Sequence, residues 1–132
     1  MASAEATTVL VYSGSRSNDK YIASRVQAAF PNVRALTVAN EAELLNVLPA
    51  VEVLFAWAFP YEHIGRATNL RWIQVMGAGV DALLRGPRLP SSVVVTNLKG
   101  VFGVAMAEYA IGYILAHAQK VRLAEQQQRA RL

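Results

Sequence analysis

The sequence predicts an α/β fold: a flavodoxin-like, doubly wound, parallel five-stranded sheet followed by a long C-terminal helix. Short runs rich in β-branched residues alternate with helical stretches along the whole chain, as in parallel βα units. Hydrophobic residues make up 54% of the 132 residues, which is typical of a packed globular core. This length allows one domain of ordinary size and excludes two full-sized ones.

The first half of the chain divides into repeated βα units. Strands are expected at residues 8–12, 33–38 and 51–57. A helix is expected at 20–30, because its apolar residues share one side and Pro31 stops it. Asn40 with Glu43 three residues later makes a capping box, which predicts a short helix ending near Leu48.

The second half adds two strands and ends in an unusually long helical segment. Strands are expected at 71–76 and 93–96, with short helices from Pro60 to about Ala67 and from Asp81 to Leu84. Nothing breaks a helix from Val104 to about Ala130, so it could run about 27 residues, or about 40 Å. After Leu123 the segment is polar, and this part has nothing of the domain to cover. The predicted division is therefore a domain at 1–103 and a C-terminal helix at 104–132.

Composition excludes several classes of protein. The absence of cysteine rules out disulfides and thiolate chemistry. The net charge is +4, but the arginines are spread singly with no aromatic platform between them, so no nucleic-acid partner is expected. No window of about 18 residues is free of charge, so no membrane span is expected. The first six residues do not resemble a secretory signal, which leaves the cytoplasm as the default location.

The segment Gly77-Ala78-Gly79-Val80-Asp81-Ala82 matches the G-x-G-x-x-A pattern of dinucleotide-binding loops. The match is expected to be false, since only a short helical turn follows and no acid stands about 20 residues on to hold a ribose. The loop can still present consecutive backbone amides to a small anion such as a carboxylate. The alternative is a tight turn that needs glycine for its backbone angles.

Other candidates are weaker on the residues alone. The loop Ser13–Ser17 has hydroxyls where flavodoxin-like folds hold phosphate, but an ordinary βα turn would look the same. Trp57 follows a strand at the edge where doubly wound sheets bind ligands, and packing is the equal alternative. Lone histidines and acids are expected in structural roles, the acids as helix caps, and no metal site is expected: His63, His117, Asp19 and Asp81.

Three stretches together resemble the D-isomer-specific 2-hydroxyacid dehydrogenases, most closely the glyoxylate/hydroxypyruvate reductase branch. They are NLRWIQVMGAGVD at 69–81, VTNLKGVFG at 95–103 and MAEY at 106–109. Any one would be weak, but G-A-G-V-D, V-T-N and A-E-Y at matching spacings are specific. The resemblance covers nearly the whole chain. It implies a flavodoxin-like substrate domain without the Rossmann domain that carries NAD(P) in the family.

The resemblance also implies an activity and site residues. The family is an oxidoreductase family that transfers hydride from NAD(P)H to the carbonyl carbon of a 2-keto acid, giving a D-2-hydroxy acid. The family's catalytic histidine, acid and arginine lie beyond the start of the cofactor domain. This chain is therefore expected to have no catalytic residue, to be inactive alone and to bind no cofactor tightly. The amides of Gly77, Ala78 and Gly79 are expected to hold the substrate carboxylate, with Ala78 also facing the nicotinamide. Asn97 lies at the cleft edge, and Trp57 is added from its strand-end position.

The expected partners are a small 2-keto or 2-hydroxy acid, the absent Rossmann domain and a second copy of the chain. The last would form a homo-oligomer through the exposed cleft face or the terminal helix. Two rival functions stay open. One is a stand-alone module that binds phosphate or FMN at 13–17, and the other is an interaction protein that docks through the basic, glutamine-rich segment 120–131.

Overall fold

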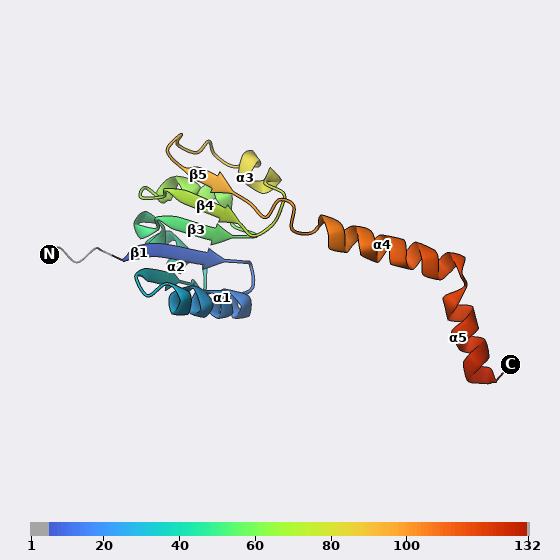
Figure 1. The fold of residues 1–132 in the computed structure, drawn as a ribbon. Helices are drawn as coiled ribbons and strands as arrows, with labels where there is room; N and C mark the ends of the chain where they lie inside the picture. The colour runs from blue at the N-terminus through green and yellow to red at the C-terminus, as the bar shows by residue number, and fades with distance from the viewer. Residues whose placement is uncertain (1–5, 132) are drawn as a thin grey trace. The chain divides into compact units, whose positions relative to one another are not determined.

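One sheet of five parallel strands forms the centre of the fold. The structure, a computed structural model, describes residues 6–131. Its strands are β1 (Thr7–Tyr12), β2 (Val33–Leu36), β3 (Val53–Ala56), β4 (Trp72–Val75) and β5 (Val94–Thr96). Their order is β2-β1-β3-β4-β5, and each neighbouring pair is parallel (Figure 1). The predicted doubly wound α/β sheet is confirmed, with its reversal of strand order at β1 and β3.

Helices connect the strands and continue past the sheet. They are α1 (Arg16–Ala29), α2 (Glu41–Val47), η1 (Leu48–Ala50), η2 (Tyr61–Arg66), α3 (Asp81–Arg85), α4 (Gly103–Ala118) and α5 (Val121–Ala130). The chain divides into two compact units, one ending at Lys99 and the other starting at Gly100. The first unit holds the sheet and its connections, and the second holds α4 and α5.

The core of the first unit lies on one face of the sheet. Alternate residues of each strand point to this face, because side chains in a strand alternate with a period of two. α2, η1, η2 and α3 contribute apolar side chains to the same cluster. Its most completely buried members are Leu10, Leu44, Leu48, Val51, Leu54 and Ile73. Four helices from three connections therefore cover a single face of the sheet.

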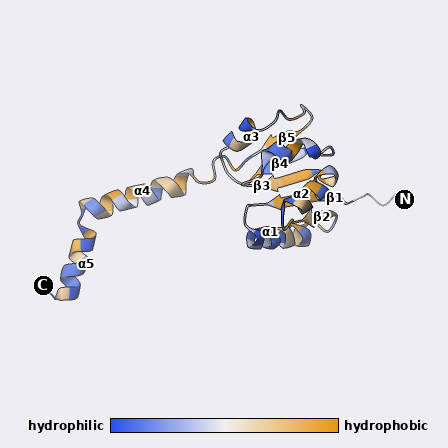
Figure 2. Cartoon of the chain, turned by 180° about the vertical axis from the view of Figure 1, so that it is seen from behind, coloured by the Kyte–Doolittle hydropathy of each residue, from blue (hydrophilic) through white to orange (hydrophobic). Residues whose placement is uncertain are grey.

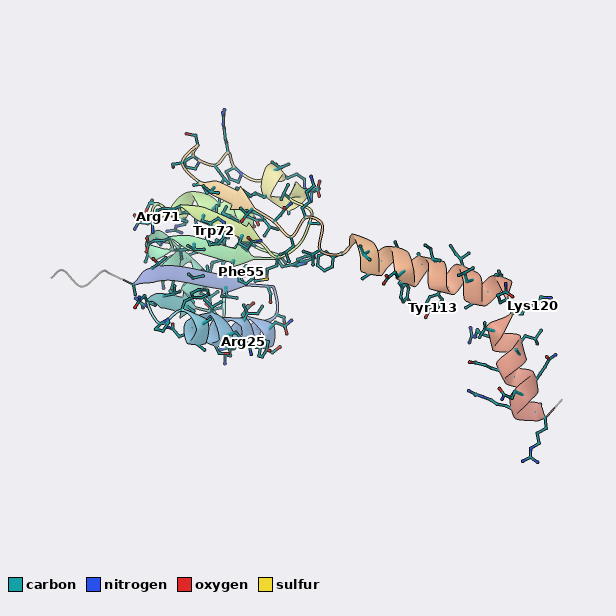
Figure 3. All side chains as sticks on the ribbon, in the orientation of Figure 1. Arg25, Phe55, Arg71, Trp72, Tyr113 and Lys120 are labelled. Atoms are coloured by element: carbon teal, nitrogen blue, oxygen red, sulfur yellow. The ribbon has the colours of Figure 1, made fainter. Side chains whose placement is uncertain are left out.

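The opposite face is covered by α1 over β1 and β2. Val53, Trp72 and Val94 are paired in register, so they share this face on β3, β4 and β5. Trp72 is 41% exposed and Val94 is 58% exposed. A groove of about 470 Å³ lies here, and its lining includes Val26 of α1 and Phe30 just after it, with Phe55 and Trp72 of the sheet, which are labelled in Figure 3. The part of this face formed by β3, β4 and β5 is thus left uncovered by the described residues of this unit.

A chain of side-chain hydrogen bonds ties β5 to β4 on that open face. The indole Nε1 of Trp72 donates to Oγ1 of Thr96 at 2.7 Å. The same hydroxyl donates to Oε1 of Gln74 at 2.7 Å. Because β5 has three residues and lies at the edge of the sheet, these bonds add to a short backbone ladder.

Two helix starts can be compared with the sequence. α1 begins at Arg16 and not at Lys20 as expected, since Ser15 is already extended at the N-cap and the helical bonds start with Asp19 N to Ser15 O. The capping box of α2 is confirmed: the amide of Glu43 donates to Oδ1 of Asn40 at 2.9 Å. The carboxylate of Glu43 accepts the amide of Ala39, one residue before the cap.

The expectation of one unbroken helix from 104 to about 130 is wrong. α4 ends at Ala118, and α5 begins at Val121 (Figure 1). Between them Lys120 adopts a left-handed conformation with φ of 54°, the backbone geometry that commonly ends a helix. Glycine or asparagine usually marks such an ending, and the sequence has neither here.

The two helices of the second unit differ in character. α4 is apolar around most of its circumference, whereas α5 is mostly polar (Figure 2). The large apolar residues of α4, among them Ile111, Tyr113, Ile114 and Leu115, are exposed. Among the residues described, no helix combines the length and the apolar character needed to cross a membrane.

Candidate functional site

Trp57 and Gly77 pack against each other at the carboxyl edge of the sheet. Trp57 follows β3 and Gly77 follows β4, and these strands are neighbours. A Cβ atom built on Gly77 would lie 2.8 Å from Cη2 of Trp57, and nearer still to Cζ3. Only a residue without a side chain fits beneath the ring. The indole is 57% exposed, so it covers the buried Gly77 and keeps an open outer surface.

This contact gives the first glycine of the loop a reason that the sequence did not show. The described glycines with positive φ are Gly14 and Gly100, and neither lies in the 77–79 loop. Backbone angles available only to glycine therefore do not explain Gly77. The close approach of an aromatic ring does.

Asn97 supports the same loop from the end of β5. Its Nδ2 donates to the carbonyl oxygen of Ala78 at 2.7 Å. The next amide, of Leu98, donates to the carbonyl oxygen of Gly77 at 2.9 Å. Both bonds use carbonyl groups of the loop, so Asn97 fixes its backbone from behind. The structure thereby brings together Trp57, Gly77, Ala78 and Asn97.

The amides of this loop have no acceptor in the described chain. Within residues 6–131, the amides of Gly77, Ala78 and Gly79 donate no hydrogen bond, whereas the preceding amide, of Met76, donates to the carbonyl oxygen of Ala56 at 2.8 Å. Successive backbone amides that have no acceptor are groups that can bind an anion such as a carboxylate.

Asp81 opposes an anion at one end of the loop. A Cβ on Gly79 would lie 3.1 Å from Oδ2 of Asp81, so this carboxylate stands beside Gly79. Asp81 is the first residue of α3, whose N-cap is Val80. It is thus an acid in the first turn and not the cap that was expected. The amides of Gly77 and Ala78 are farther along the chain from this charge.

The loop does not fit a complete dinucleotide site. α3 has 5 residues, too few for the helix whose N-terminus holds a pyrophosphate in such sites. The exposed Asp81 carboxylate would also repel a phosphate. The rejection of the G-x-G-x-x-A match therefore agrees with the geometry.

The first loop is closed on itself. The amide of Ser15 donates to Oγ of Ser13, and the hydroxyls of Ser15 and Ser17 lie 3.2 Å apart. Asp19, in the first turn of α1, accepts the amide of Ser13 at 2.5 Å. It is 4% exposed. The expectation that Asp19 caps a helix is wrong: α1 begins four residues earlier than expected, its N-cap is Ser15, and Asp19 lies in its first turn.

The histidines lie apart from the loop at 77–79. Nε2 of His63 is 3.0 Å from Oε1 of Glu41, which joins η2 to the start of α2. His117 lies in the last turn of α4, in the second unit. In the part of the chain that the structure describes, no group of three or more His, Cys, Asp or Glu residues could hold a metal ion. Burial raises the pKa of Tyr61, a core residue of η2, so it stays neutral at ordinary pH.

Comparison with solved structures shows which proteins this chain resembles. No protein-family model matches the chain. A D-isomer-specific 2-hydroxyacid dehydrogenase family protein from Aeromonas salmonicida superposes with a TM-score of 0.71 and 28% identity, over 96% of this chain and 40% of that one. The structural relatives of this chain are D-isomer-specific 2-hydroxyacid dehydrogenases. This confirms the resemblance found in the sequence.

Two further relatives extend the comparison. A dehydrogenase of the same description from Xanthobacter autotrophicus, solved with NADPH and MES, superposes with a TM-score of 0.60 at 27% identity, over 96% of this chain and 40% of that one. The glyoxylate/hydroxypyruvate reductase A of Photorhabdus laumondii is 32% identical over 71 residues, which are 49% of this chain and 23% of the reductase. The chain thus spans about two fifths of the solved dehydrogenases and under a quarter of that reductase.

Proposed function

We propose that this chain is the substrate-binding domain of an NAD(P)-dependent oxidoreductase that reduces small 2-keto acids, of the glyoxylate and hydroxypyruvate type, to D-2-hydroxy acids. The observation that carries the proposal is the loop at 77–79. Its amides face no acceptor in the described chain, its carbonyls are held by Asn97 and Leu98, and its first glycine lies under Trp57. A keto acid offers the carboxylate that such amides bind.

Each residue has a distinct part in this proposal. The amides of Gly77, Ala78 and Gly79 bind the carboxylate. Trp57 forms an apolar wall beside it, and the exposed Ala78 faces the nicotinamide side. Asn97 acts mainly by positioning the loop, because its amide group is already engaged by Ala78.

Hydride transfer needs groups that we place on a separate cofactor domain. The loop at 77–79 does not form a dinucleotide site, so the nicotinamide would be held by that other domain. We propose that residues 104–132 lead toward such a Rossmann domain and that the 132-residue chain alone is inactive. Cytoplasmic location remains a prediction from the sequence.

Titration of the ¹⁵N-labelled chain with glyoxylate tests the site directly. We expect amide shifts at Gly77, Ala78 and Gly79, saturating at about millimolar concentration, since a few hydrogen bonds in an open site give weak binding. Glycolaldehyde, which lacks the carboxylate, is the matched control and is expected to leave these amides unmoved. Equal responses to both compounds would contradict the proposal.

Turnover provides a second and independent test. The pure chain, mixed with NADPH and glyoxylate or hydroxypyruvate, is expected to leave the absorbance of NADPH unchanged. Oxidation of NADPH that depends on the keto acid would show that the chain carries its own catalytic groups and would overturn the assignment of catalysis to another domain.

We also propose that the isolated chain self-associates. Ile111, Tyr113, Ile114 and Leu115 of α4 are each more than half exposed, with Trp72 and Val94 partly exposed on the sheet. Apolar surface on this scale exceeds what monomers usually leave in water. A second copy of the chain is the partner that is always present to cover it.

A further inference from the structure

A cavity of about 370 Å³ lies at the carboxyl ends of β1 and β2, apart from the 77–79 loop. Its walls come from the end of β1 and from the starts of α1, α2 and η2. The chemistry-bearing residues that line it are Tyr12, Arg16, Asp19, Glu41, Glu62 and His63. None of the residues assigned above to the keto-acid site lines this cavity.

The position of the cavity in the fold is one where ligands bind. The strand order is β2-β1-β3. The connection after β1 therefore runs to a neighbour on one side of β1, and the connection after β2 crosses back to β3 on the other side. At such a reversal the connections diverge above the carboxyl ends of the strands and leave a crevice. A volume near 370 Å³ is at the lower end for small-molecule sites, so the crevice suits a compact ligand.

A buried carboxylate without a counter-charge lines the cavity. Asp19 is 4% exposed, and its Oδ1 accepts the amide of Ser13 at 2.5 Å. No hydrogen bond from a described residue reaches its Oδ2, and within residues 6–131 no Lys, Arg or His nitrogen lies within 4.0 Å of it. Among the described residues no buried side-chain oxygen lacks a hydrogen-bond partner, so Oδ2 of Asp19, which accepts none, keeps contact with the cavity. A cationic group in the cavity would supply the counter-charge that this carboxylate lacks.

The other charges extend this argument. Glu41 is paired with His63, whereas Arg16 and Glu62 are exposed on the rim and form no ion pair with a described residue. A phosphate or FMN at the neighbouring Ser13–Ser17 loop would meet three carboxylates on the cavity walls. The charge thus opposes a phosphate ligand, while Arg16 still offers one site for an anionic group.

We propose that this cavity binds a small zwitterionic amine, with its ammonium group at Asp19 and its carboxylate at Arg16. Charge-assisted hydrogen bonds from the ammonium group would go to Oδ2 of Asp19, which accepts no hydrogen bond from the described chain and has no counter-charge nearby. The site is separate from the keto-acid loop, so either can fail without the other.

The test is an amide-shift titration of the ¹⁵N-labelled chain with 4-aminobutyrate. Shifts are expected at residues 13–19 and 40–41, and the amides of 77–79 should stay in place. Butylamine and butyrate, which each carry one of the two charges, are expected to bind at least about tenfold more weakly. Butylamine binding as tightly as 4-aminobutyrate, or inorganic phosphate binding more tightly, would overturn the proposal.

Substitutions identify the groups responsible. Asp19→Asn keeps an oxygen that can accept the Ser13 amide but removes the charge, and we expect at least about tenfold weaker binding. Arg16→Gln changes an exposed side chain, so its fold is expected to persist while binding also weakens. Glu125→Gln in α5 is the control for net charge and should bind like the unaltered chain. Unchanged binding in both Asp19→Asn and Arg16→Gln, each with a native-like spectrum, would also overturn the assignment.

Discussion

At the scale of single residues, Gly77 shows how a contact between distant positions fixes the choice of amino acid. Gly77→Ala places a methyl group where the Trp57 ring now lies. We expect the ring to be displaced and the free energy of unfolding to fall by about 1–3 kcal/mol, the usual cost of overpacking. Urea unfolding followed by circular dichroism measures the loss, and tryptophan fluorescence reports the ring.

A matched control separates this contact from a general effect of replacing glycine. Gly65 in η2 has nothing within 4 Å of a built Cβ and no positive φ. Gly65→Ala should therefore change stability by less than about 0.5 kcal/mol in either direction. Similar losses in the two variants would mean that Trp57 does not restrict position 77.

Removing the charge of Asp81 is expected to strengthen anion binding at the loop. Its carboxylate lies beside Gly79, so it repels an anion at the loop. Asp81→Asn should tighten glyoxylate binding about two- to fivefold, an effect of like charge near the surface that fades with added salt. Amide-shift titrations at low and high salt measure it. Glu62→Gln, which removes an equal charge outside this loop, should leave the affinity unchanged, and a tightening there would point to net charge alone.

The limits of sequence reasoning at this scale follow from distance along the chain. The glycine loop and Trp57 were singled out from local pattern and Asn97 from the family resemblance, and the structure brings them together. The reason for Gly77 was missed, because a ring 20 positions earlier reaches it only when β3 and β4 are neighbours. Asp19 was missed for a simpler reason: its burial depends on where α1 begins.

At the scale of elements, β5 depends on one hydroxyl. Thr96 accepts from Trp72 and donates to Gln74 across the strand pair. Thr96→Val keeps the shape but breaks both bonds; because these bonds are exposed and water can replace them, we expect a loss of about 0.5–1.5 kcal/mol in the free energy of unfolding and faster amide exchange at β5. Thr68→Val is the control, since Thr68 lies exposed in a loop and its hydrogen bond, from its backbone amide to the carbonyl oxygen of Arg66, does not use the side chain. Equal stability of the two variants would remove the role given to this network.

Elements with strong local signals were predicted well. All five strands and the capping box at Asn40 were placed from apolar runs and cap chemistry. The break at Lys120 was not, because a lysine in the left-handed region carries no compositional signal. Helix propensity alone favours continuing through this position, and only the backbone shows the ending.

At the scale of the whole molecule, the apolar circumference of α4 determines what the isolated chain does in solution. A helix that is apolar all round is normally buried. The titratable side chains of α4 are those of Glu108, His117 and two tyrosines. The chain should therefore form dimers or larger species at micromolar concentration, which light scattering would measure. The driving force would be burial of α4, since each Å² of apolar surface removed from water contributes about 25 cal/mol of favourable free energy.

Substitutions in α4 decide whether that helix is the cause. Ile111 and Leu115 are four residues apart and so share one side of α4. Replacing both by glutamine keeps helix propensity while removing apolar surface, and the variant should run as a monomer with unchanged unfolding of the sheet unit. Gln127→Ala with Gln128→Ala, in α5, is the control and should self-associate like the unaltered chain. A clean monomer of the unaltered chain at high concentration would rule out α4 as an assembling surface. Assembly that survives the α4 substitutions would instead point to the open sheet face at Trp72 and Val94.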